Sequence, residues 1–208
     1  MGSENMDFLY TKNFDEQKAR AMEGLRQALE EGKVDEDIIP LLDEINSLEN
    51  YFTTSSCSGR ISVMEMPHFG DKVNSVWLGK WHRTVKVEEV LEAIGRHEKG
   101  QLWFLVRSPI LHVGARTLED AVKLLNLAIG LGFKYSNIKS VSHKKLLVEI
   151  RSTERMDVPL GSDGELWVDE AYIERIVTIA NDQLRRFKGQ LKRLEEEVEK
   201  IENTHQPL

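Results

Sequence analysis

The chain has 208 residues, of which 40% are hydrophobic and 30% charged, a composition typical of a soluble globular protein with one substantial core. Its single cysteine, Cys57, excludes an intrachain disulfide and a cysteine-cluster metal site, and it fits a reducing cytoplasm. No apolar run approaches the roughly 18 residues of a membrane span, so we expect a cytoplasmic protein without a membrane partner.

The net charge of −7 is distributed unevenly along the chain. Residues 1–50 carry 5 Lys and Arg against 13 Asp and Glu, whereas residues 51–168 carry 16 against 13. Phosphate binding requires cations, so the middle of the chain is where a nucleic-acid surface is expected if the fold gathers them. Scattered surface charge is the alternative.

Hydrophobic periodicity and turn residues predict a mixture of helices and strands. In chain order, the patterns predict helices over 14–29 and 35–48, strands over 51–52, 61–66 and 76–81, a helix over 85–94, and strands over 101–106 and 110–115. A helix over 118–131 and strands over 138–141 and 146–150 follow. Residues 157–160 then lead into a Gly and Asp loop, and a long helix is predicted over 169–203. Thr117 and Asp120 form a capping-box pattern at the start of the helix over 118–131.

The pattern of elements predicts an α+β fold, a layered mixed sheet packed with helices and ending in a long carboxy-terminal helix. We expect one domain over 1–208, with an acidic helical part at 8–49, a catalytic α/β core at 50–168 and the long helix at 169–203. Gly130 and Gly132 follow a helix and are expected to end it, so the chain has no glycine-rich nucleotide loop and no Rossmann-type domain.

The long helix carries an apolar stripe spaced alternately by three and four residues, as in a coiled-coil seam. Such a stripe must be buried, and we expect it to pack on the first helix of the same chain, with a dimer contact as the second possibility. Its members are Leu184, Phe187, Leu191, Leu194, Val198 and Ile201.

The polar octet at residues 53–60, with the sequence TTSSCSGR, concentrates small hydrogen-bonding side chains before a glycine and a fixed cation. Backbone of this kind can approach a ligand closely, and the layout suits an anionic or zwitterionic group. The alternative is a polar turn between two elements.

His112 lies on an apolar strand, where it could accept a proton at cellular pH, although a core histidine without catalytic function remains the alternative. Arg116 lies four residues further on and therefore on the same strand face. Arg151 and Ser152 end another strand. Cys57 with His82 or His112 could form a nucleophile and its base. The six histidines show no metal-ligand spacing, so we expect no metal.

Several of these segments together resemble one family, the tRNA wybutosine-synthesising protein 3 family in its free-standing archaeal form. The segments that carry the resemblance are GKVD at 32–35, IN at 45–46, TTSSCSGRI at 53–61, WL at 77–78 with His82, PILHV at 109–113, AR at 115–116, GFK at 132–134 with Ser136, IRST at 150–153, VPL at 158–160, Tyr172 and AN at 180–181. The chain departs from the family pattern at Trp81, where serine or threonine is common, and at Asn137, where glycine is usual.

The resemblance implies methyl transfer from S-adenosylmethionine to ring nitrogen N4 of the modified tricyclic guanine, 7-aminocarboxypropyl-demethylwyosine, beside the anticodon of phenylalanine tRNA. It implies that the octet, the histidine strand and the Arg151 strand line one cleft. The implied catalytic residues are His112, Ser55 and Arg60; the implied cofactor-binding residues are Ser55, Ser56, Ser58, Arg60, His112, Ala115, Arg116, Arg151 and Ser152.

For the RNA we expect contacts from Trp77, Lys80, Lys134, Ser136, Lys139 and Asn181, and Trp81 could stack on a base. The expected partner is the anticodon loop of phenylalanine tRNA, and the expected state is a monomer or weak dimer. A non-catalytic RNA-binding module that uses the same basic middle with Trp77 and Trp81 is the alternative function.

Overall fold

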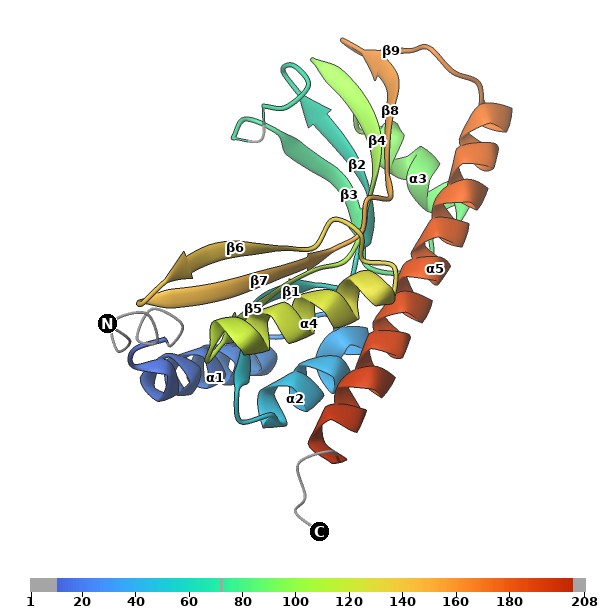
Figure 1. Ribbon diagram of the computed structural model, residues 1–208. Helices are drawn as coiled ribbons and strands as arrows, with labels where there is room; N and C mark the ends of the chain where they lie inside the picture. The colour runs from blue at the N-terminus through green and yellow to red at the C-terminus, as the bar shows by residue number, and fades with distance from the viewer. Residues whose placement is uncertain (1–10, 72, 204–208) are drawn as a thin grey trace. The chain divides into compact units, whose positions relative to one another are not determined.

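The computed structural model describes residues 11–71 and 73–203, and Figure 1 labels their helices and strands. In chain order the elements are α1 (Phe14–Glu30), η2 (Glu36–Ile38), α2 (Ile39–Ser47), β1 (Tyr51–Cys57), β2 (Arg60–Met66), β3 (Val76–Trp81), α3 (Val87–Ile94), β4 (Gln101–Arg107), β5 (Ile110–Ala115), α4 (Leu118–Gly130), β6 (Asn137–Ser142), β7 (Lys145–Arg151), β8 (Arg155–Ser162), β9 (Glu165–Leu166) and α5 (Glu170–Asn203). Residues 8–10 of the predicted acidic part lie outside the described residues.

The chain divides into two compact units. Unit 1 takes the described residues up to Ser58, then Pro109–Thr153, and the chain from Lys188 on. Unit 2 takes Gly59–Ser108 and Glu154–Phe187, so α5 contributes its first half to unit 2 and its second half to unit 1. The single domain over 1–208 stays a prediction.

Unit 1 is built on a four-stranded antiparallel sheet in the order β1-β5-β7-β6. One face carries the buried side chains of Leu111, Val113, Val148 and Ile150, which join α2, α4 and the second half of α5 in one core (Figure 1). Because side chains alternate along a strand, His112 and Glu149 lie on the opposite face of this sheet. The core therefore holds the strands that carry the candidate site without enclosing the site itself.

Unit 2 is built on a five-stranded antiparallel sheet in the order β3-β2-β4-β8-β9. Ile61, Val63 and Phe104 on one face pack with α3 and the first half of α5. The other face carries a smaller cluster of Met64, Met66 and Leu105. No helix among the described residues is long and apolar enough to span a membrane.

The predicted α+β class and the long carboxy-terminal helix are confirmed, and the strands divide between two antiparallel sheets. The helix expected over 35–48 is a short 3-10 turn, η2, followed by α2. Pro40 is the second residue of α2, where a missing N–H breaks no intrahelical hydrogen bond. Asp35 makes no side-chain cap there; its carboxylate accepts a hydrogen bond from the backbone N–H of Ser58 instead.

The prediction that strand structure stops at the polar octet is wrong. Residues 53–57 continue β1 and pair with β5, so only Ser58 and Gly59 separate β1 from β2. Gly59 has a φ of 92°, the left-handed conformation that favours glycine. Strand pairing with β5 overrides the low strand propensity of a serine-rich segment.

Residues 157–160, for which no strand is predicted, belong to β8, and the expected Gly and Asp loop is reduced to a turn at Asp163 and Gly164. Pro159 is tolerated opposite Trp103, next to a register shift in the β4–β8 pairing. The apolar stripe of α5 is buried, but in the two unit cores: Leu184 and Phe187 belong to unit 2, and Leu194 lies in unit 1 with α2 and α4. The first helix contributes the partly buried Leu25 to that packing.

Candidate active site

The structure brings the three chemically informative segments together as neighbouring strands of unit 1. In the sheet register Ser55 on β1 lies opposite His112 on β5, and His112 lies opposite Glu149 on β7. Two residues further along β1, Cys57 is opposite Ile110, which in turn is opposite Arg151. Residues distant in sequence therefore form one row across three strands.

The row forms a continuous chain of hydrogen-bonding groups. Ser55 Oγ lies 2.7 Å from Nδ1 of His112, and Nε2 of the same ring lies 2.7 Å from Oε2 of Glu149. Lys139 Nζ lies 2.5 Å from that carboxylate oxygen and 3.1 Å from His112 Nε2. A hydroxyl, an imidazole and a carboxylate in this order can take up and pass on a proton.

Two strand irregularities frame this row. The β1–β5 register shifts between Thr53 and Ser55, and the β6–β7 register shifts between Ile138 and Ser140, so Thr54 and Lys139 occupy bulge positions. Bulges re-aim side chains and recur beside active sites. Asn46 of α2 fixes the first bulge, because its Oδ1 accepts from Thr53 N–H at 2.7 Å and its Nδ2 donates to Thr53 Oγ1 at 2.9 Å.

Glu149 is the most strongly perturbed acid of this cluster. Its side chain is 8% exposed. The hydrogen bond from Lys139 above all, against the opposing effect of burial and helped by His112, lowers the pKa of Glu149 from 4.5 to about 2. The carboxylate therefore carries a negative charge throughout the neutral range.

This lowered pKa makes the stability of the fold depend on pH in the acid range. A carboxylate with a depressed folded-state pKa stabilises the native state above its unfolded pKa, and that contribution disappears as pH falls from 4.5 to about 2. We expect Glu149→Gln to lower the free energy of unfolding by on the order of 1–3 kcal/mol at pH 7 and by much less near pH 2. Urea unfolding of both proteins across this pH range measures the difference. The exposed Glu119→Gln serves as control, and a difference that does not narrow in acid contradicts the assignment.

A cavity of about 530 Å³ opens in unit 1 beside β1. Ala21, Gly24, Leu25 and Ala28 of α1 form an apolar wall, together with Val34 and Leu42, and hydroxyl-bearing residues 53–56 form a polar one. Arg20 and Lys33 supply cations to the lining. Ser55 belongs both to this lining and to the His112 row, so one residue connects the cavity with the proton acceptor.

Three residues assigned to cofactor binding from the sequence are engaged within the fold of unit 1. Ser58 is fully buried, and its Oγ accepts a hydrogen bond from Lys188 Nζ at 2.6 Å. Ala115 is also fully buried. The Arg116 guanidinium donates to Asn50 and lies over the ring of Phe14, 4.3 Å from its centroid.

Arg116 also lies well along the strand from His112. Four residues of extended chain span about 13 Å, so the backbone of Arg116 is about that far from the backbone of His112. Arg116 Nη2 also donates a hydrogen bond to Asp15 Oδ1 at 2.7 Å. Together with the contact to Phe14, this hydrogen bond ties α1 to the end of β5. The predicted role of Arg116 in binding cofactor thus stays a prediction, while its structural role is visible.

The segment around Arg151 lies next to the His112 row. Arg151 lies 3.9 Å from Glu149 Oε1 and 5.2 Å from the centroid of the exposed Tyr135 ring. Ser136 accepts from the backbone N–H of Arg151 and donates to Phe133 O, which shapes the turn before β6. Ser152 is buried and Lys134 is exposed, so of these two the lysine is open to a ligand from solvent.

In unit 2, Arg60 and Trp77 form a cationic and aromatic surface on β2 and β3. The Arg60 guanidinium lies 5.1 Å from the centroid of the Trp77 ring, and Lys80 Nζ lies 5.9 Å from it. Trp77 is 45% exposed. Trp81 packs instead against the core of unit 2, and its ring occupies the space where a Cβ on Gly79 would stand. Trp77 is therefore the more accessible stacking surface.

Asn181 was expected to touch RNA, and the structure gives it a structural contact in unit 2. Its Oδ1 accepts from Val85 N–H at 2.9 Å and its Nδ2 donates to Val85 O at 2.8 Å, which ties α5 to the segment before α3. We expect Asn181→Ala to lower the free energy of unfolding by about 1–3 kcal/mol, since both backbone groups of Val85 lose a partner. Urea denaturation measures the loss of unfolding free energy, and Asp182→Ala, at an exposed position of the same helix, is the control. A variant with full stability but weaker RNA binding would restore the RNA role instead.

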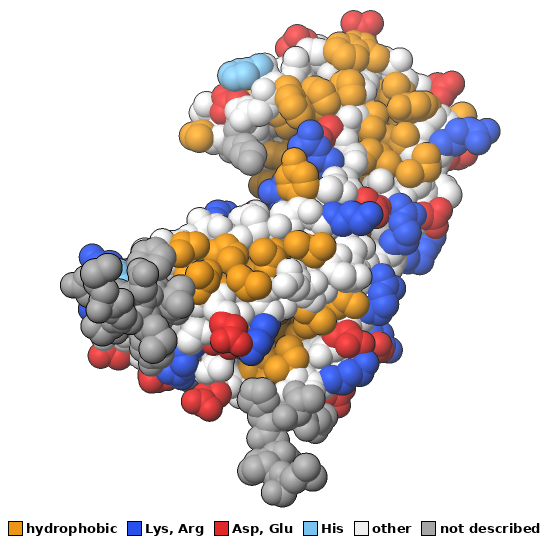
Figure 2. Space-filling model, viewed as in Figure 1, with side chains coloured by type: hydrophobic (Ala, Val, Ile, Leu, Met, Phe, Trp, Pro, Cys, Tyr) orange, Lys and Arg blue, Asp and Glu red, His pale blue; other side chains and the backbone are white. Residues whose placement is uncertain are grey.

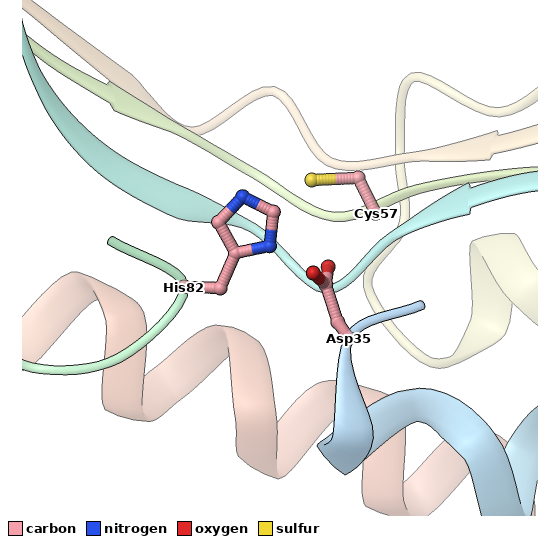
Figure 3. A group of neighbouring side chains, drawn as sticks. All are labelled: Asp35, Cys57 and His82. Carbon is pink, nitrogen blue, oxygen red and sulfur yellow. The ribbon is translucent and has the colours of Figure 1, made fainter. Parts of the chain in front are cut away.

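The sequence missed three residues that shape this region: Glu149, Asn46 as a positioning group, and Asp35. Figure 3 shows Asp35 and Cys57, both of unit 1, with His82 of unit 2. The Asp35 carboxylate and Cys57 Sγ lie within 4.8 Å of each other. His112 faces Ser55, two residues along β1 from Cys57, so the proton acceptor considered for a cysteine nucleophile is engaged by a serine. The contact between Ser55 and His112 depends on the pairing of β1 with β5, which the spacing of residues in the sequence does not reveal.

Charged side chains are mixed on the face of the molecule shown in Figure 2, where Lys and Arg lie among Asp and Glu. The described residues visible on this face therefore form no continuous basic patch.

Comparison with known proteins places the chain in a family. Residues 16–200 match the family described as Methyltransferase TYW3. The chain belongs to this family of methyltransferases.

Individual relatives are similar along nearly their whole length. A Thermococcus kodakarensis protein named tRNA(Phe) 7-((3-amino-3-carboxypropyl)-4-demethylwyosine(37)-N(4))-methyltransferase 1 is 85% identical over 94% of this chain and 98% of its own. A Thermococcus sibiricus protein named as the corresponding methyltransferase is 70% identical over 93% and 98%. A solved structure of a Pyrococcus horikoshii protein, 72% identical, has a TM-score of 0.89 and covers 91% of this chain and 97% of that chain.

Proposed function

We propose that this protein methylates ring nitrogen N4 of 7-aminocarboxypropyl-demethylwyosine in phenylalanine tRNA, with S-adenosylmethionine as methyl donor. The observation that supports it most directly is Ser55, a residue that lines the cavity beside β1 and whose hydroxyl lies 2.7 Å from the His112 ring. A methyl acceptor bound there would have a proton acceptor at hand. The names of the similar proteins agree with this substrate.

The residues around the cavity fit S-adenosylmethionine. A volume of about 530 Å³ is within the range of small-molecule sites, roughly 300–1,000 Å³. The apolar wall from α1 suits a purine ring, the hydroxyls of Ser55 and Ser56 suit ribose or amino-acid groups, and Lys33 or Arg20 suits a carboxylate. When bound, the cofactor supplies an activated methyl group on a sulfonium.

The remaining work of the protein is positioning and removal of one proton. We assign Ser55 and His112 to the proton, and Ser55, Ser56 and Arg151 to polar groups of cofactor or modified base. Arg60, which begins β2 beside Trp77, is proposed to contact the tRNA, as are Lys80 and Lys134. We further propose that the protein acts in the cytoplasm, as a monomer or weak dimer.

A methylation assay tests the proposal. Phenylalanine tRNA bearing the unmethylated tricyclic base is incubated with radiolabelled S-adenosylmethionine. The nucleosides of the product are then identified by mass spectrometry. Label at the N4-methylated nucleoside supports the function. RNA binding without S-adenosylmethionine binding in calorimetry, and without label, would favour the non-catalytic RNA-binding module instead.

Trp77 offers a separate test of the RNA contact. Stacking of one base on an aromatic side chain contributes about 1–3 kcal/mol, so we expect Trp77→Ala to weaken tRNA binding by on the order of tenfold to a hundredfold. Trp167→Ala removes another exposed tryptophan of unit 2 and is the matched control. Fluorescence anisotropy with labelled tRNA measures both, and equal affinities of the two variants would remove Trp77 from the interface.

A further inference from the structure

Glu149 has no part in the methyl-transfer scheme above, yet it is the acid in closest contact with the proposed base. The register of β5 and β7 sets it opposite His112, and its carboxylate lies 2.7 Å from Nε2. Lys139, Asn137 and Arg151 surround the same carboxylate at 2.5, 3.4 and 3.9 Å. A buried charge held by several donors is fixed in position.

The contacts decide which nitrogen of His112 carries the proton. Glu149 is ionised, so the hydrogen between its oxygen and Nε2 must belong to the ring. A neutral imidazole has one N–H, and Nδ1 is then left with a lone pair facing Ser55 Oγ. The Ser55 hydroxyl consequently donates to Nδ1.

Lys139 presents a competing arrangement, because its Nζ lies 3.1 Å from Nε2 and could donate to a bare nitrogen. That arrangement would set a ring lone pair against the ionised oxygen at 2.7 Å, two acceptors without a hydrogen between them. The shorter contact of Lys139, to Glu149 Oε2 at 2.5 Å, satisfies the ammonium without this repulsion. The Nε2-protonated ring is thus the arrangement in which all four groups are paired.

We propose that Glu149 is a positioning residue that holds His112 with its proton on Nε2, so that Nδ1 accepts a proton through the Ser55 hydroxyl. The inference rests on the proposed function. As the acceptor nitrogen gains the methyl group, its proton goes to Ser55 Oγ while the hydroxyl proton of Ser55 goes to Nδ1. The resulting imidazolium lies between Ser55 and the Glu149 carboxylate, which stabilises its charge.

The tautomer is measured directly by two-bond proton–nitrogen correlation spectra of histidine-labelled protein, with His112 assigned from the spectrum of His112→Ala. We expect Nε2 protonation in the unaltered protein, a mixture in Glu149→Gln, whose amide can either donate or accept, and a return toward Nε2 in Glu149→Asp. Protonation at Nδ1 in the unaltered protein, or an unchanged tautomer in Glu149→Gln, overturns the inference whether or not methylation is detected.

Kinetics give the second measurement. We expect Glu149→Gln to lower kcat by about 10²–10⁴-fold with KM for tRNA nearly unchanged, and Glu149→Asp to recover part of the loss. Glu65→Gln is the matched control, since Glu65 is also buried but accepts from the backbone N–H groups of Glu98 and Lys99 in unit 2. Full kcat in Glu149→Gln, with an active unaltered enzyme, overturns the inference and leaves the proposed function standing. An inactive unaltered enzyme defeats the proposed function, and the spectra still decide the tautomer.

Discussion

His112→Ala is expected to lower kcat for methyl transfer by about 10²–10⁴-fold, the usual contribution of a positioned general base. The reason is geometric: His112 Nδ1 is 2.7 Å from the hydroxyl of Ser55, a residue that lines the cavity, and Glu149 holds the other ring nitrogen. Single-turnover assays on tRNA bearing the unmethylated base measure the loss without interference from product release.

His143→Ala is the matched control for this variant. His143 is exposed in the turn between β6 and β7 of the same unit, so its removal deletes an imidazole at the surface. We expect this control to keep the unaltered rate. Full methylation by His112→Ala with an unchanged pH profile would remove His112 from the chemistry.

Phe187→Ala is expected to lower the free energy of unfolding by about 3–5 kcal/mol, the largest stability effect that we anticipate. Phe187 is fully buried in the core of unit 2, among Phe104, Leu184 and Ile173, and truncation leaves a cavity there. Denaturation in urea, followed by circular dichroism, measures the change in midpoint.

Lys192→Ala on the exposed side of α5 serves as the control and should change stability by less than about 0.5 kcal/mol. The same experiment addresses the dimer contact considered for the apolar stripe. If the stripe is buried within one chain, the unfolding midpoint is independent of protein concentration. A loss below 1 kcal/mol in Phe187→Ala, or a midpoint that rises with concentration, would contradict this packing.

Local sequence patterns were sufficient where an element is stabilised by its own residues. The Thr117–Asp120 capping box and the periodic apolar positions of α4 predict that helix correctly, because caps and amphipathic faces depend on residues close in sequence. They failed at residues 53–57 and 155–162. Serine-rich and proline-containing segments have weak strand propensity, and both became strands through pairing with partners far along the chain.

In the candidate site, too, some residues could be identified from the sequence and others could not. His112 and the serines were identified because their residue types carry chemistry wherever they occur. Glu149 was missed, since a single acid in an otherwise apolar strand forms no motif by its spacing. Its contact with His112 depends on the β5–β7 register, a property of two segments 37 positions apart.

The division of α5 between two cores has a consequence for synthesis on the ribosome. Leu191, Leu194 and Val198 belong to the same core as Leu41 and Leu42, about 150 residues earlier, so unit 1 cannot close until the second half of α5 has emerged. Until then the apolar faces of α2 and α4 lack the α5 side chains that pack against them and remain partly exposed to solvent. The nascent chain should therefore need chaperone protection late in translation, and a stall after Phe187 should leave unit 1 open to proteolysis.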